Sequence, residues 1–273
     1  MPTTKADHPE TSKPVTIPDF ARWKNQGRPI SVLTAYDFTF ARLLDEAGVD
    51  CLLVGDSLGT TVQGHETTLP VTLDQMVYHT EMVARGAHRA FVVADLPFMS
   101  YQPSVSDALR AAGRLLKETR CRAVKLEGGR AFAPTISALV DAGIPVMGHI
   151  GLMPQSVHRL GGYKVQRDQE ALLADARAVA DAGAFAMVLE CVPADLARAV
   201  SEAVSVPTIG IGAGVGCDGQ VLVLHDMLGL LDSFRPKFAR RYAELASSVR
   251  DAARAYVDDV KHRRFPSDAE SFS

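Results

Sequence analysis

Eight short apolar runs, separated by longer amphipathic stretches, constrain the fold of this chain more than any other feature of its sequence. The runs are rich in Val, Ile and Leu and show little polar alternation, which is typical of parallel strands covered by helices. The predicted strands are Ile30–Ala35, Cys51–Gly55, Phe91–Ala94, Ala123–Leu126, Pro145–His149, Ala186–Leu189, Pro207–Ile211 and Val221–Leu224.

The amphipathic stretches between these runs have helical periodicity, and several end in a glycine that can close a helix. Eight strands with interleaved helices predict an α/β fold, a (β/α)8 TIM barrel, with a doubly wound open sheet as the alternative. A last, long stretch is expected to pack outside the barrel or against another subunit. The predicted helices are Phe38–Glu46, Leu73–Arg85, Ser106–Glu118, Ala133–Asp141, Glu170–Ala182, Ala194–Ala203 and Phe238 to about Val260.

The length of 273 residues suits one barrel domain, which we expect over residues 17–265. Residues 1–16 are polar and lack the apolar core of a signal peptide, so we expect a disordered lead-in and a cytoplasmic protein. Residues 266–273 are expected to form a tail.

Composition excludes several classes of partner. A formal net charge of -3 and a pI near 6.2 give no reason to expect nucleic acid or an anionic membrane. No apolar run approaches the roughly 20 residues that span a bilayer. The cysteines form no C-x-x-C pair, so free and mostly buried thiols are favoured over a disulfide or zinc site. They are Cys51, Cys121, Cys191 and Cys217.

Polar side chains stand at the ends of most predicted strands. In a (β/α)8 barrel these ends meet at one mouth, where active sites are built. One such residue is usually a helix cap or turn former, but several converging carboxylates would repel one another without a purpose. The residues are Tyr36, Asp37, Asp56, Ser57, Asp95, Lys125, Glu127, His149 and Glu190.

The carboxylates Asp56, Asp95 and Glu127 offer hard oxygen ligands of the kind that Mg²⁺ prefers. Zinc is disfavoured, because His65-Glu66 opens a zinc-protease motif in which Leu69 replaces the second histidine. Lys125 is a natural partner for an anionic substrate, with a surface lysine in a loop as the structural alternative.

The glycine-rich stretch Gly210–Gly214 invites comparison with a dinucleotide-binding fingerprint. Its third glycine position holds Val215, and it follows a late strand, whereas the fingerprint opens the first βαβ unit. A tight turn that lets the backbone approach a ligand or a neighbouring strand is the better interpretation.

Eight segments, in matching order from about Ile30 to Ala239, resemble the ketopantoate hydroxymethyltransferase family. After GGYKVQ the chain continues directly with RDQEALLAD, where many relatives carry a longer loop, and Cys217 follows GIGAG where another residue type is expected. The segments are VGDSLG, TVQGHETTLPVT, ADLPFMSY, VKLEGG, GHIGLMPQS, GGYKVQ, LECVP and GIGAG.

The resemblance implies a (β/α)8 barrel that uses Mg²⁺ and 5,10-methylenetetrahydrofolate to hydroxymethylate 3-methyl-2-oxobutanoate. It also implies a homo-oligomer, most commonly a decamer. Transferred by motif, the metal ligands are Asp56, Asp95 and Glu127, and the general base is Glu190. The keto-acid contacts are Asp56, Ser57, Asp95 and Lys125, and His149 matches a histidine at the site.

Two other functions stay open from the sequence. One is a Mg²⁺-dependent lyase or mutase that acts on another 2-oxo acid, since related barrels place carboxylates in a similar way. The other is a binding or scaffold barrel without catalysis. The combined GHETTLPVT and GGYKVQ match disfavours the lyase, and the intact site residues disfavour the scaffold.

Overall fold

The eight apolar runs form eight parallel strands that close into a barrel, so the (β/α)8 prediction is confirmed and the open sheet is wrong. The structure, a computed structural model, describes residues 13–162, 165–231 and 236–272. The strands are β1 (Ile30–Thr34), β2 (Cys51–Val54), β3 (Phe91–Asp95), β4 (Ala123–Glu127), β5 (Val146–Gly151), β6 (Ala186–Glu190), β7 (Thr208–Ile211) and β8 (Gly219–Leu222).

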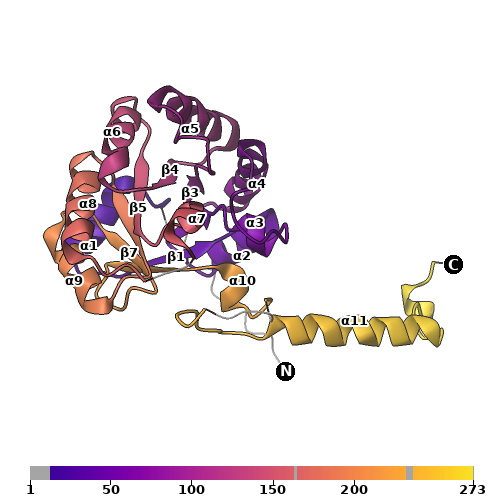
Figure 1. Cartoon of the computed structure of the whole chain (residues 1–273). Helices are drawn as coiled ribbons and strands as arrows, with labels where there is room; N and C mark the ends of the chain where they lie inside the picture. The colour runs from indigo at the N-terminus through magenta and orange to yellow at the C-terminus, as the bar shows by residue number, and fades with distance from the viewer. Residues whose placement is uncertain (1–12, 163–164, 232–235, 273) are drawn as a thin grey trace. The chain divides into compact units, whose positions relative to one another are not determined.

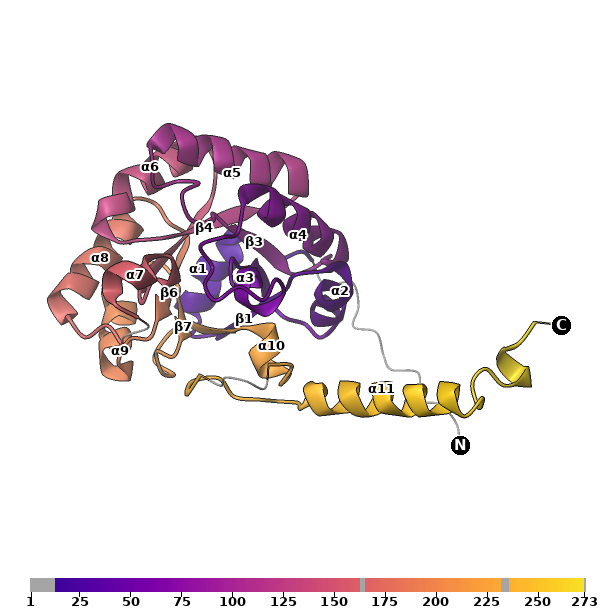
Figure 2. The same cartoon turned by 45° about the vertical axis from the view of Figure 1, so that its right-hand side comes forward.

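Helices surround the strands, as Figures 1 and 2 show from two directions. Side chains that precede the helices fix where they begin: Asp37 accepts a hydrogen bond from the Phe40 backbone N–H, and Thr72 and Gln75 form a capping box. The helices are α1 (Ile17–Asn25), α2 (Phe38–Glu46), α3 (Leu58–Thr61), α4 (Leu73–Gly86), α5 (Val105–Thr119), α6 (Ala133–Asp141), α7 (Val157–Leu160), α8 (Gln169–Asp181) and α9 (Ala194–Ala203), with 3-10 turns η1 (Arg130–Phe132) and η2 (Pro154–Ser156).

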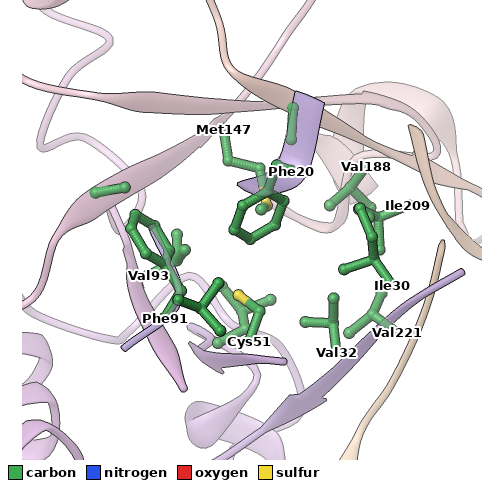
Figure 3. Packing of buried hydrophobic residues seen from close by; sticks show 14 of the residues in the cluster. Phe20, Ile30, Val32, Cys51, Phe91, Val93, Met147, Val188, Ile209 and Val221 are labelled. Carbon is green, nitrogen blue, oxygen red and sulfur yellow. The ribbon is translucent and has the colours of Figure 1, made fainter. Parts of the chain in front are cut away.

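Helix α1, which the sequence analysis did not predict, packs against the barrel at the end where the strands begin. Phe20 from this helix is fully buried, and its ring lies 5.4 Å from that of Phe91 and 5.2 Å from that of Phe185. Figure 3 shows Phe20 among strand residues such as Val188 and Ile209. The apolar interior is therefore filled from this end, which leaves the opposite end of the barrel for polar side chains.

Two predicted elements begin two or more residues away from the position that the structure gives them. Strand β8 starts at Gly219 rather than Val221, because Gly219 and Gln220 pair with both β1 and β7 even though they are not apolar. The last helix, α11, spans Leu245–Lys261 and not Phe238–Val260. The backbone N–H groups of Tyr242 and Leu245 instead donate to the carbonyls of Met227 and Leu228, which prevents a helix there.

The chain divides into two units, Met1–Leu222 and Val223–Ser273. The first contains the barrel. The second contains α10 (Leu224–Met227), α11 and the 3-10 turn η3 (Asp268–Glu270). The predicted boundaries of the lead-in, the single domain and the tail stay predictions, and residues 1–12 and 273 lie outside the described chain. Among the described residues, no helix combines the length and apolarity needed to cross a membrane.

Candidate active site

Six of the predicted site residues come together where β2 to β6 end. Asp95 is the last residue of β3, and its Cα pairs in register with that of Lys125 on β4. Glu127 ends β4 and pairs with His149 on β5, while Glu190 ends β6. Asp56 directly follows β2. The convergence expected from strand-end spacing is therefore present.

Lys125 is a buried cation at the centre of this group. Its Nζ lies 2.7 Å from Asp95 Oδ1 and 3.3 Å from His149 Nδ1. The residue lies within β4 and is only 4% exposed, so the alternative of a surface lysine in a loop is wrong. Burial lowers the pKa of Lys125, but the carboxylates of Asp95 and Glu127 together raise it above its usual value. The side chain is therefore a permanent positive charge.

The short stretch Gly55–Ser57 connects the end of β2 to its two neighbouring strand ends. The Asp56 backbone N–H donates to Asp95 Oδ2 at 3.0 Å, and Ser57 Oγ lies 2.8 Å from the Tyr36 hydroxyl. A Cβ on Gly55 would lie 2.7 Å from Ser57 Oγ, so a side chain there would displace the serine. This explains why β2 is followed by a glycine.

Negative charge exceeds positive charge in this buried cluster. Asp56, Asp95 and Glu127 are each 3–4% exposed, and Lys125 alone offers them a lysine or arginine charge in direct contact among the described residues. Burial and then the charge of Asp95 raise the pKa of Asp56 to about 7. Burial and then the charge of Asp56 raise the pKa of Glu127 well above its usual value. A divalent cation would balance this excess of negative charge.

His149 lies between the buried lysine and Glu190. Its Nδ1 faces Lys125 Nζ, and its Nε2 lies 3.3 Å from Glu190 Oε2. Burial and the charge of Lys125 lower the pKa of His149, so the ring is neutral near pH 7. Because a lysine can only donate, Nδ1 accepts and the ring proton is on Nε2, which faces Glu190.

The donor set fits a divalent cation that prefers oxygen ligands. Within the described ranges, no group of three or more His, Cys, Asp or Glu side chains is arranged so that it could hold a metal ion. Mg²⁺ does not need such a group, because it binds through one or two carboxylates and keeps several waters. Asp95 Oδ1 contacts Lys125 but has no aligned hydrogen-bond donor, and the excess negative charge around Asp56 favours a cation.

Comparison with known proteins identifies the family. The family model described as ketopantoate hydroxymethyltransferase matches residues 14–268. The chain belongs to the ketopantoate hydroxymethyltransferase family. A 3-methyl-2-oxobutanoate hydroxymethyltransferase of Rhodopirellula baltica is 57% identical over 94% of this chain and 96% of its own length. One of Syntrophotalea carbinolica is 56% identical over 94% of this chain and 98% of its own length.

Among solved structures, a 2,3-dimethylmalate lyase of the PEP mutase/isocitrate lyase superfamily resembles this chain with a TM-score of 0.61. The match covers 94% of this chain and 91% of the lyase at 20% identity. At that identity the likeness shows the barrel fold alone. The assignment to the ketopantoate hydroxymethyltransferase family therefore rests on the sequence relatives and the family model.

Other sequence predictions have mixed outcomes. Asp37 is a helix cap, as a lone strand-end carboxylate usually is. Gly212 and Gly214 adopt positive φ angles in the turn after β7, as predicted for GIGAG. All four cysteines are free, with Cys51 and Cys121 buried and the other two half-buried. In the segment GGYKVQ, residues 163 and 164 lie outside the described chain.

Sequence reasoning from strand ends missed Gln155, which joins three parts of the site. Its side-chain N–H groups donate to Asp56 Oδ2 at 2.9 Å and to the Leu96 carbonyl at 3.0 Å. Its backbone N–H donates to Glu127 Oε2, and its side-chain oxygen accepts from the Tyr101 hydroxyl. Gln155 lies in the short 3-10 turn η2 and Tyr101 in a loop, both beyond strand ends, where hydrophobic periodicity carries no signal. Their only sequence signal is the family segments GHIGLMPQS and ADLPFMSY.

We predict that Gln155→Leu lowers the free energy of unfolding by about 1–3 kcal/mol, because it leaves buried acceptors of Asp56 and Leu96 without a donor. Urea unfolding followed by circular dichroism measures this change. Gln102→Leu is the matched control, since it removes only the half-buried donor to Gln155 Oε1 and should cost about 1 kcal/mol or less. Equal losses in the two variants would contradict the role given to Gln155.

Proposed function

We propose that this chain transfers a hydroxymethyl group from 5,10-methylenetetrahydrofolate to 3-methyl-2-oxobutanoate, which gives 2-dehydropantoate for pantothenate and coenzyme A biosynthesis. The observation that carries the proposal is its likeness, over almost its whole length, to relatives named for this transfer. The donor's methylene carbon and the oxygen of one water molecule become the new group. The lyase or mutase alternative has only a likeness of fold in its support.

Asp56, Asp95 and Glu127 would hold Mg²⁺, as the excess of buried negative charge among them supports. The bound ion would withdraw electrons from the keto group and so make the neighbouring C3 hydrogen more acidic. Gln155 keeps Asp56 and Glu127 in place by donating one hydrogen bond to each carboxylate. This support limits movement of the ligand oxygens.

Lys125 and Ser57 would bind the carboxylate of the keto acid. Lys125 supplies a fixed positive charge from within β4, and the Ser57 hydroxyl, which contacts Tyr36, supplies a hydrogen bond from beyond the end of β2, on the other side of β3. Two contacts from different strands fix the orientation of a small acid and bring its C3 toward one side of the site. His149 would contact the acid on the side of Glu190.

Glu190 would take the proton from C3 as general base. It stands at the end of β6, and its side chain is 16% exposed, more than those of Asp95 and Glu127. Among the described residues, no lysine or arginine forms an ion pair with Glu190. The side chain beside it is that of His149, which is neutral. A carboxylate in this position can accept a proton from a bound substrate.

We predict that the purified chain forms 2-dehydropantoate from the two substrates, that EDTA abolishes the reaction and that Mg²⁺ restores it. Asp56→Asn should weaken Mg²⁺ binding at least about tenfold, because it removes one of the charges that attract the cation. Isothermal titration with Mg²⁺ measures binding independently of turnover.

Asp37→Asn is the matched control for this experiment. Asp37 also follows a strand, but it caps α2, a role that asparagine fills equally well. Its Mg²⁺ affinity should equal that of the unchanged chain. Full activity in EDTA, or equal Mg²⁺ binding by both variants, would exclude the metal site.

For the base, we predict that Glu190→Gln lowers kcat by about 10²–10⁴-fold and leaves keto-acid and Mg²⁺ binding nearly unchanged, since glutamine keeps the shape but cannot accept the proton. Exchange of the C3 hydrogen of 3-methyl-2-oxobutanoate in heavy water isolates this step from the folate step. The exposed Glu202→Gln on α9 serves as the control and should exchange at the normal rate. Normal exchange in Glu190→Gln would remove Glu190 from the mechanism.

We also propose that the chain assembles into a homo-oligomer, a decamer. Helix α11 carries an apolar stripe, defined by Val249, Tyr256, Val257 and Val260, whose residues are 44–59% exposed. Such a stripe on a 17-residue helix is typical of a surface that packs against another chain.

Sedimentation at micromolar concentration should give a mass about ten times 29.3 kDa. Tyr256→Asp should lower that mass, because it places a charge in the apolar stripe. Ser247→Asp adds the same charge on the opposite face of α11, nine residues or about 180° away, and should leave the mass unchanged. A monomeric mass for the unchanged chain would contradict the proposal.

A further inference from the structure

A polar pocket lies beside the N-terminal ends of β3 and β4. Asp95, Lys125 and Glu127 lie at the opposite ends of these two strands. The volume of the pocket is about 280 Å³. The end of α4, the loop into β3 and the residues around the end of α5 surround it. The lining residues are Ala84, Arg85, Ala87, His88, Ala90, Val92, Arg120 and Arg122.

Half of these lining residues are basic. Three are arginines and one is histidine, and no acidic residue is among the described residues that line the pocket. Like charges in one concave space repel one another, and each arginine keeps its charge at any ordinary pH. A bound anion would relieve this repulsion.

Local contacts hold the Arg122 side chain in place, and the backbone fixes the position of Arg120. Arg122 Nη1 donates to the Val15 carbonyl at 2.7 Å, and its guanidinium lies 6.0 Å from the Phe91 ring centre. Arg120 directly follows α5 as its C-cap residue and has the left-handed conformation, with a φ of 67°. The Arg122 backbone N–H donates to the Val92 carbonyl at 2.9 Å. The pocket is therefore built on the barrel itself.

Neither of the two carboxylates near the pocket, Asp45 and Glu81, neutralises its positive charge. Asp45 accepts hydrogen bonds from the backbone N–H groups of His88, Arg89 and Ala90 and does not line the pocket. Glu81 lies 3.9 Å from Arg85, and both side chains are about half exposed, so this ion pair is weak.

We infer that this pocket binds a small phosphorylated anion. Guanidinium groups present paired N–H donors that match the oxygens of a phosphate group, and several of them together favour a dianion over a single carboxylate. The volume accommodates a phosphate group with a few further atoms. The site is separate from the cluster around Lys125, and it does not depend on the proposed reaction.

The test is isothermal titration of the full chain, without Mg²⁺, by sodium pyrophosphate, by inorganic phosphate and by citrate. The unchanged chain should bind pyrophosphate. Arg120→Asn should weaken that binding at least about tenfold, which is the usual effect of removing a charge-assisted hydrogen bond. Asparagine tolerates the left-handed conformation at this position, so the variant keeps the end of α5. Arg85→Gln is a second variant with the same expected direction.

Lys117→Asn is the matched control, because it removes one positive charge from α5 outside the pocket. Its pyrophosphate affinity should stay within about twofold of that of the unchanged chain. Inorganic phosphate bound as tightly as pyrophosphate would identify one phosphate group as the whole ligand. No binding of either phosphate, equal weakening in Lys117→Asn, or citrate bound as tightly as pyrophosphate would overturn the inference.

Discussion

The ion pair between Lys125 and Asp95 is the interaction on which the rest of the candidate site depends. Both side chains are almost completely buried and 2.7 Å apart, so neither charge can be compensated by water. Removing one partner of such a pair costs about 3–5 kcal/mol, because it leaves an uncompensated charge in the interior. The same lysine also lowers the pKa of His149 and stabilises the charged form of Asp56. One side chain thus adds to the effect of burial on His149 and opposes it on Asp56.

The barrel places these groups together through strand register. In the ladder of β3 and β4, Asp95 pairs with Lys125, and in that of β4 and β5, Glu127 pairs with His149. A shift of one residue would turn every side chain of a strand to its other face. The apolar filling at the opposite end, where Phe20 contacts Phe91 and Phe185, helps to hold that register. The packing of α1 and the charges at the mouth are therefore linked through the same strands.

Much of this arrangement could be predicted from the sequence, because parallel strands leave a simple pattern. The apolar runs located all eight strands, and the polar residues that follow them located the candidate site. The pattern failed where a contact with another segment decides the structure. Strand β8 begins at Gly219 because that residue pairs with β1. Gln155, in η2, donates a hydrogen bond to Asp56, from which it is 99 positions away in the chain. Likewise, the strand-end pattern by itself does not distinguish Asp37, which caps a helix, from Asp56, which joins the cluster.

The carboxylates of the site differ in their access to solvent, and His149 lies between the buried ones and Glu190. Asp95 and Glu127 have side chains that are 3–4% exposed, whereas that of Glu190 is 16% exposed. If His149 were cationic, it would form an ion pair with Glu190. Burial and Lys125 keep the ring neutral, so Glu190 has a hydrogen-bond donor beside it without a neutralising charge. Lys125, which we propose binds the anionic end of the substrate, therefore also helps to keep the residue beside the proposed base Glu190 uncharged.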